Sequence, residues 1–85
     1  MTEKTLVAGT NLEARPAAIF VQTASKFSSN IHISINNRTV NAKSIMGIMS
    51  IGLVDGTSVI IEASGRDAED AVGELKMFLE RADVG

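Results

Sequence analysis

The chain of 85 residues contains no cysteine, no tryptophan and no tyrosine, and its one proline is Pro16. The absence of cysteine excludes disulfides, thiolate zinc sites and cysteine nucleophiles. Three phenylalanines are the only aromatic residues, so the core must be mostly aliphatic. Residues 1–4 lead into no apolar signal core, and no apolar run approaches the roughly 20 residues of a membrane span. We therefore expect a cytoplasmic protein that has no membrane segment, metal ion or cofactor.

Charge and glycine patterns exclude further classes. Eight basic and ten acidic residues leave a formal net charge of −2, and no run of Lys or Arg occurs. Direct binding to nucleic acid is disfavoured, because no positive field exists to release phosphate counterions. No glycine-rich phosphate loop and no nucleophile–base pair is evident, so we expect a protein that is not an enzyme. A hydrophobic content of 45% without linkers or repeats predicts a single domain over residues 1–85.

Hydrophobic periodicity predicts the architecture. Ile31, Ile33 and Ile35 alternate with polar residues, as in a strand with one buried face, and Asn36-Asn37 can form the tight turn that follows. Apolar residues at helical spacing occur after Pro16 and again after Asp67, which can cap the last helix. The expected strands cover residues 5–8, 31–35, 38–41 and 57–63, and the expected helices cover 15–27, 44–51 and 67–82. This β-α-β-β-α-β-α order predicts an α+β open-faced β-sandwich, a four-stranded antiparallel sheet with three helices on one face.

The segment from Lys43 to Ser50, KSIMGIMS, predicts a short helix that is apolar on nearly every side. Ser44 suits its N-cap, where the hydroxyl accepts a hydrogen bond from a backbone N–H. A helix of this length can bury only one stripe. We expect Ile48 and Ile51 to face the core. The remaining apolar side chains should face outward and form a docking surface for a partner, and these are Ile45, Met46 and Met49.

Two motifs resemble the HPr family, the small phosphocarriers of the bacterial sugar phosphotransferase system. Residues 12–17, LEARPA, are similar to the family's active-site segment Gly-(Leu/Ile)-His-Ala-Arg-Pro-Ala, and residues 43–50 resemble the regulatory serine segment of Gram-positive members. The resemblance covers nearly the whole chain and implies an HPr-like fold. It also implies that Ser44 is phosphorylated. The N-cap and phosphorylation roles are compatible, because a phosphate at this position meets N–H donors.

The first motif departs from the family at the residue that carries its chemistry. Glu13 stands where the family has its phosphoacceptor histidine, and Asn11 replaces a glycine. A carboxylate is a poor substitute, because its acyl phosphate would hydrolyse easily and its charge repels the donor. His32 cannot take over, since we expect it to be solvent-exposed in mid-strand. Arg15, which would stabilise an acceptor phosphate in the family, should contact a partner or pair with Glu13.

A retained serine site and a lost histidine site are similar to the pattern of the catabolite-repression HPr-like proteins (Crh). That resemblance implies phosphorylation of Ser44 by the ATP-dependent HPr kinase/phosphorylase. It further implies that the chain is a co-repressor of catabolite control protein A, a LacI-type repressor, in carbon catabolite repression.

Two other functions stay open: a phosphocarrier of the phosphoenolpyruvate-dependent system that acts through Glu13, and a regulator of glycolytic enzymes. The chain could be a monomer or a homodimer. Ser50 is expected on the helix surface, and residues 67–70 are expected to match the helix dipole and not to bind a cation.

Overall fold

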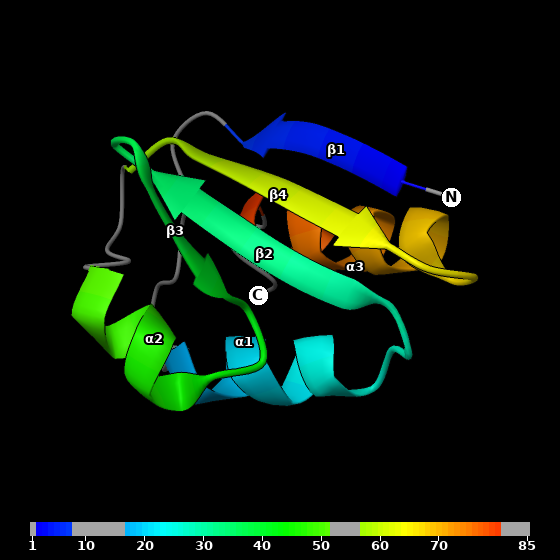
Figure 1. Cartoon of the computed structure of the whole chain (residues 1–85), viewed down its shortest axis with the longest axis horizontal. Helices are drawn as coiled ribbons and strands as arrows, with labels where there is room; N and C mark the ends of the chain where they lie inside the picture. The colour runs from blue at the N-terminus through cyan, green and yellow to red at the C-terminus, as the bar shows by residue number, and fades with distance from the viewer. Residues whose placement is uncertain (1, 8–16, 52–56, 81–85) are drawn as a thin grey trace.

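The computed structural model describes residues 2–7, 17–51 and 57–80. Within them the chain forms four strands and three helices in the predicted β-α-β-β-α-β-α order (Figure 1). The elements are β1 (Thr2–Val7), α1 (Ala17–Ser25), β2 (Asn30–Ile35), β3 (Arg38–Asn41), α2 (Ile45–Ile51), β4 (Val59–Ser64) and α3 (Ala68–Glu80).

The four strands form one sheet in the order β1-β4-β2-β3, and all neighbours are antiparallel. β1 pairs with β4 from Thr2 opposite Ser64 to Val7 opposite Val59. The predicted start of this strand at Thr5 was therefore too late. The polar residues before Thr5 lie on an edge strand, where pairing with β4 holds them in the sheet even though they bury little surface. The predicted start of the last strand at Thr57 was too early, because β4 begins at Val59.

The period-two pattern of β2 was interpreted correctly. Ile31, Ile33 and Ile35 are at most 4% exposed, while His32 lies on the opposite, solvent-exposed face. β4 repeats the alternation, with buried side chains at its first, third and fifth positions. α3 passes behind β4, and α1 and α2 lie along one side of the molecule (Figure 1). The predicted α+β open-faced β-sandwich is confirmed, and the outer face of the sheet is open to solvent.

The hairpin between β2 and β3 turns on Asn36 and Asn37, as predicted. Both have positive φ, 50° and 69° respectively. Two successive left-handed residues are typical of a type I′ turn, whose twist matches that of the flanking strands. Asparagine tolerates this region better than other non-glycine residues. The turn places Ile35 opposite Arg38 and so sets the register of β3.

The core lies between the helices and the covered face of the sheet. Phe20 of α1 is fully buried and meets Phe78 of α3 edge to face, with ring centroids 5.9 Å apart. α1 ends two residues earlier than predicted. The N–H groups of Lys26 and Phe27 donate to carbonyls three residues back, which tightens the last turn in the 3₁₀ manner. The helical spacing after Asp67 predicts an inward stripe that consists of Ala68, Ala71, Val72, Leu75, Phe78, Leu79 and Ala82. The first four of these and Leu79 are buried, and Phe78 is half-buried against the core. Ala82 lies outside the described residues.

Candidate functional site

Ser44 stands immediately before α2 and caps it. Its Oγ accepts a hydrogen bond from the N–H of Gly47 at 3.1 Å. Its carbonyl accepts the first helical bond, from Ile48 N–H at 3.0 Å. The predicted N-cap role of Ser44 is confirmed. The serine as a whole is half-buried.

The residue before Ser44 fastens this end of α2 to two other elements. Lys43 donates from its backbone N–H to Asn41 Oδ1 at 2.8 Å, at the end of β3. Its Nζ donates to the carbonyl oxygen of Phe27 at 2.6 Å, just beyond α1. The Lys43 ammonium is thus engaged within the chain. Sequence reasoning did not find this tie, because a lysine at a helix start carries no sign of a partner 16 residues away.

The short helix divides its apolar residues as predicted. Ile48 and Ile51 are buried, whereas Met46 and Met49 are 79% and 70% exposed. Ile45 is also exposed, at 39%. We call the exposed group Ile45, Met46 and Met49 the α2 patch. It starts directly beside Ser44, so a modification of that serine would change the charge next to an apolar surface.

Gly47 lets α2 lie close to β3. A Cβ at this position would lie 3.3 Å from the Cβ of Val40 and 3.4 Å from Ser44 Oγ. A larger side chain would therefore crowd both the strand and the Ser44 hydroxyl. Ser50, one turn later, is exposed and its Oγ donates to the Gly47 carbonyl at 2.9 Å. Its predicted position on the helix surface is confirmed.

Of the other candidate residues, the structure describes only His32. His32 is exposed on the open face of the sheet, opposite Glu62 of β4 and Asn41 of β3. Its predicted exposure is confirmed. Asn11, Glu13 and Arg15 lie outside the described residues, so the predicted contact of Arg15 with Glu13 or with a partner stays a prediction.

Asp67 plays a part that sequence reasoning missed. Its carbonyl accepts the N–H of Ala71 and so begins α3, as an N-cap residue does. Its carboxylate, however, accepts hydrogen bonds from the backbone N–H groups of Ser28 and Ser29, at 2.8 and 2.9 Å, and from the Ser29 hydroxyl. The predicted side-chain cap of α3 is replaced by a clamp onto the loop between α1 and β2. No local pattern signals it, since Ser29 precedes Asp67 by 38 residues.

The clamp stabilises the charged form of Asp67. The Ser29 hydroxyl contributes most, followed by the backbone N–H of Ser28, and together with weaker donors they lower the pKa of Asp67 from 3.8 to about 2. Glu69 and Asp70 follow in the first turn of α3, where negative charge suits the helix dipole. Among the residues that the structure describes, no three His, Asp or Glu side chains gather as metal ligands would. None of the helices described has the length and apolarity needed to cross a bilayer.

Comparison with known proteins adds independent evidence. A sequence model described as "PTS HPr component phosphorylation site" matches residues 2–81. The HPr-like protein Crh of Halalkalibacterium halodurans is 44% identical over 72 residues, which are 85% of this chain and 86% of the relative.

Two solved structures extend the likeness to three dimensions. The crystal structure of HPr from Bacillus anthracis is 41% identical, with a TM-score of 0.86, and the match covers 93% of this chain and 98% of the other. The crystal structure of Crh from Bacillus subtilis, described as a dimer with a swapped domain, is 40% identical with a TM-score of 0.74 over 91% and 88% of the two chains.

HPr and Crh proteins are phosphocarriers or regulators and not enzymes. The family match over most of the chain, the identity to Crh and the shared topology agree with one another and with the two sequence motifs. The chain belongs to the HPr family.

Proposed function

We propose that this chain is a regulatory member of the HPr family, phosphorylated on Ser44 by an ATP-dependent HPr kinase/phosphorylase. In this proposal the phosphorylated form acts as co-repressor of a LacI-type catabolite control protein in carbon catabolite repression. The observation that carries it is a half-buried serine at the start of α2, directly beside the exposed α2 patch. Glu13 at the position of the phosphoacceptor histidine and the identity to Crh support it.

Phosphorylation would change the site mainly by adding charge. The Ser44 Oγ attacks the γ-phosphorus of ATP, the new Oγ–P bond replaces the bond to ADP, and the hydroxyl proton passes to a base on the kinase. A phosphoserine adds about −1.5 to −2 of charge at pH 7. The Gly47 N–H, which now donates to Oγ at 3.1 Å, is at hand for a phosphate oxygen. The fold should therefore tolerate phosphorylation, and we expect the added charge to act by changing the binding of a partner.

The α2 patch supplies the apolar part of the proposed interface. Met46 and Met49 project from α2 with most of their surface in water, and methionine adapts its shape to an apolar groove. An arginine or lysine of the repressor would pair with the phosphate, because such pairs make strong charge-assisted hydrogen bonds. The Lys43 ammonium donates to the Phe27 carbonyl, so we expect the partner to provide this cation.

The alternative is a phosphocarrier of the phosphoenolpyruvate-dependent sugar system that acts through Glu13. The family's phosphorylation-site model supports it, since the model matches residues 2–81. The residue type argues against it, because an acyl phosphate on a carboxylate hydrolyses easily. Restoring transfer with Glu13→His would show that only the acceptor is missing.

One experiment separates these functions. The protein is offered ATP with HPr kinase, and separately phosphoenolpyruvate with enzyme I, and the phosphate is located by mass spectrometry after an acid-stability test. We expect an acid-stable ester on Ser44, lost in Ser44→Ala and retained in Ser50→Ala, a matched exposed serine of the same helix. An acid-labile phosphate on Glu13 would instead support the carrier, and an ester on another serine would refute the proposal.

Co-repression is tested by binding of the phosphorylated protein to the repressor, measured by calorimetry. Met49→Glu should weaken binding by about tenfold or more, because it puts a charge into the apolar contact. Met77→Glu is the matched control, since Met77 is 62% exposed but lies on α3. Tight binding of the unmodified chain to a glycolytic enzyme would favour the third function, a regulator of metabolic enzymes that uses the same patch.

We also propose that residues 1–85 act as one HPr-like domain in the cytoplasm, where ATP and the kinase are found, and that the chain forms homodimers. The dimer described for Bacillus subtilis Crh supports the last point. Light scattering over a concentration series tests it, and a mass of one chain at every concentration would refute it.

A further inference from the structure

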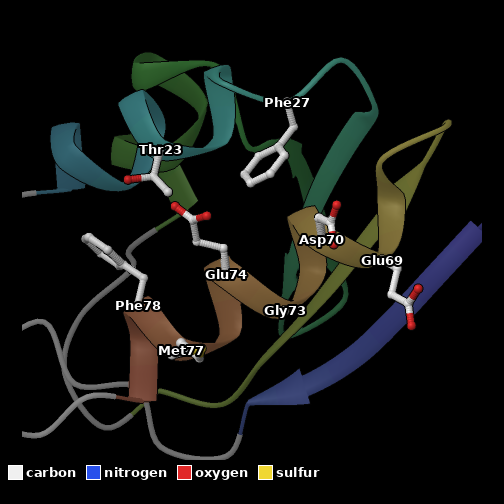
Figure 2. A pocket seen from close by; sticks show the side chains of 8 residues that line it. All are labelled: Thr23, Phe27, Glu69, Asp70, Gly73, Glu74, Met77 and Phe78. Carbon is white, nitrogen blue, oxygen red and sulfur yellow. The ribbon is translucent and has the colours of Figure 1, made fainter.

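A groove of about 750 Å³ lies between the C-terminal end of α1 and α3 (Figure 2), and none of its lining residues belongs to the α2 patch. In Figure 2 the ring of Phe27 projects into the space between the two helices, and Glu74 extends from α3 toward Thr23. Phe27 and Phe78 are half-buried, and Met77 is 62% exposed. The residues that line the groove are Thr23, Phe27, Glu69, Asp70, Gly73, Glu74, Met77 and Phe78.

The charge of this α1/α3 groove is negative. Three of its residues, Glu69, Asp70 and Glu74, carry carboxylates. Two described cations lie beside it: Lys26, which pairs with Glu74, and Lys43, whose ammonium donates to the Phe27 carbonyl. Lys26 Nζ is 2.5 Å from Glu74 Oε2 and 5.8 Å from the centroid of the Phe27 ring. Glu69 and Asp70 form no ion pair with another described residue. An apolar surface with an excess of carboxylates at its rim is complementary to a ligand that is both apolar and cationic.

Gly73 gives a second, independent indication that the groove binds another chain. It lies in the interior of α3, where glycine is the least favourable residue apart from proline. Its φ is not positive, and a Cβ added to it would meet no atom within 4 Å. Neither a turn nor close packing within the described chain requires glycine here. Its effect is to leave the α3 backbone uncovered in the middle of the groove, where another chain can approach closely.

We propose that the α1/α3 groove docks a basic amphipathic helix of a partner protein. From Glu69 to Phe78 the wall formed by α3 is about 13.5 Å long at 1.5 Å per residue, or two and a half turns of a helix lying along it. Apolar residues of the partner would pack on Phe27, Met77 and Phe78, with one of them crossing α3 at Gly73. Lysine or arginine residues would pair with the carboxylates at the rim.

The exposure of the groove favours a helix over a small molecule. Most of its lining residues, including Asp70, Gly73 and Met77, are exposed. A small ligand would stay largely in water here, whereas ligand pockets usually bury about 70–90% of their ligand. An amphipathic helix instead covers a long, shallow surface with anchors at spacings of three and four residues. This surface is separate from the α2 patch, so the chain would contact two partners at once.

The test uses a synthetic helical peptide of about 18 residues, long enough to be partly helical in water. Leucines follow one helical face and lysines flank them, and a second peptide has glutamates in place of the lysines. Each is titrated into the ¹⁵N-labelled, unphosphorylated chain, so the result does not depend on Ser44. We expect saturable shifts of amide signals from residues 23–27 and 69–78 with the lysine peptide only. No saturable shift, or shifts centred on the α2 patch or the open sheet face, would overturn the proposal. Groove shifts that follow protein concentration without peptide would also overturn it, because they would mean that a second copy occupies the groove.

Variants distinguish binding in the groove from non-specific electrostatic attraction between the peptide and the chain. Asp70→Lys should weaken binding by about tenfold or more, while Glu62→Lys, the same charge change on the open sheet face, should change it less than about twofold. If Asp70→Lys and Glu62→Lys weakened peptide binding equally, net charge alone would explain the binding and the proposed site would be refuted. Gly73→Leu should abolish binding without lowering the thermal midpoint, because leucine is the better helix former and its Cβ would meet no atom within 4 Å. Lys26→Met should tighten binding, since it leaves Glu74 unpaired for the peptide.

Discussion

Replacing Gly65 by alanine tests the joint between β4 and α3. Gly65 has φ of 150°, a conformation that L side chains rarely adopt. An added Cβ would lie 2.5 Å from Ser29 Oγ and 2.8 Å from Ser29 Cα, closer than the 3.0 Å that real Cβ atoms respect. Ser29 is only 1% exposed and is held by the Asp67 carboxylate. Because the clash involves held backbone, it cannot be relieved by rotating a flexible side chain.

The expected loss of stability has two contributions, the backbone strain at the φ of Gly65 and the steric clash with Ser29. A residue forced into such a φ costs about 1–3 kcal/mol. Overpacking against a buried neighbour costs about 1–3 kcal/mol more. The sum, about 2–6 kcal/mol, is a large share of the roughly 5–15 kcal/mol that stabilises a small domain. At about 4–8 °C per kcal/mol, a loss in the middle of this range lowers the melting temperature by roughly 15–30 °C.

Urea unfolding followed by circular dichroism measures the effect, with the m-value unchanged if only stability is lost. Gly73→Ala is the matched control, because a Cβ there meets nothing within 4 Å. It should raise the free energy of unfolding by about 0.5–1 kcal/mol through better helix propensity. The reasoning would be refuted if Gly65→Ala unfolded at the wild-type urea concentration, or if the two substitutions changed stability in the same direction.

Three further predictions concern the core, the hairpin and the clamp. Leu75→Ala should lower the free energy of unfolding by about 2–5 kcal/mol, because Leu75 is fully buried. Met46→Ala, on the exposed side of α2, should change it by no more than about 0.5 kcal/mol. Comparable urea midpoints for the two variants would contradict this assignment of core and surface. Asn37→Val should cost about 1–3 kcal/mol in the same assay, because a β-branched residue is strained at φ of 69°, and an unchanged midpoint would argue against the type I′ turn. The Ser29 and Ser28 donors lower the pKa of Asp67 from 3.8 to about 2. The clamp therefore contributes its full stabilisation above about pH 3.8, and this contribution is lost as the pH falls toward 2. Acid unfolding of Asp67→Asn should therefore depend less on pH between about 4 and 2 than that of the wild type, and parallel curves would show that the clamp has no role.

Local patterns account for what was predictable about the candidate site. The cap at Ser44 depends on residues three and four positions away, and the division of α2 into buried Ile48 and exposed Met46 and Met49 depends on the helical repeat. The turn at Asn36-Asn37 follows from the backbone preference of asparagine. Where edge pairing decided the outcome, as in β1, the predicted boundary was wrong, because polar residues on an edge strand show no periodicity.

The amino-acid sequence by itself determined the element order, the buried faces of β2 and of the helices, the family and the place of Ser44 at a helix start. Each of these depends on neighbours within about four positions or on a contiguous motif. Only the tertiary structure decided that Asp67 clamps Ser28 and Ser29, that Lys43 donates to the Phe27 carbonyl beyond α1, and that carboxylates of α3 border an apolar groove. Those pairings join residues 16 to 39 positions apart in the chain, and they form only when the helices and loops have packed together on the sheet, which no local pattern encodes.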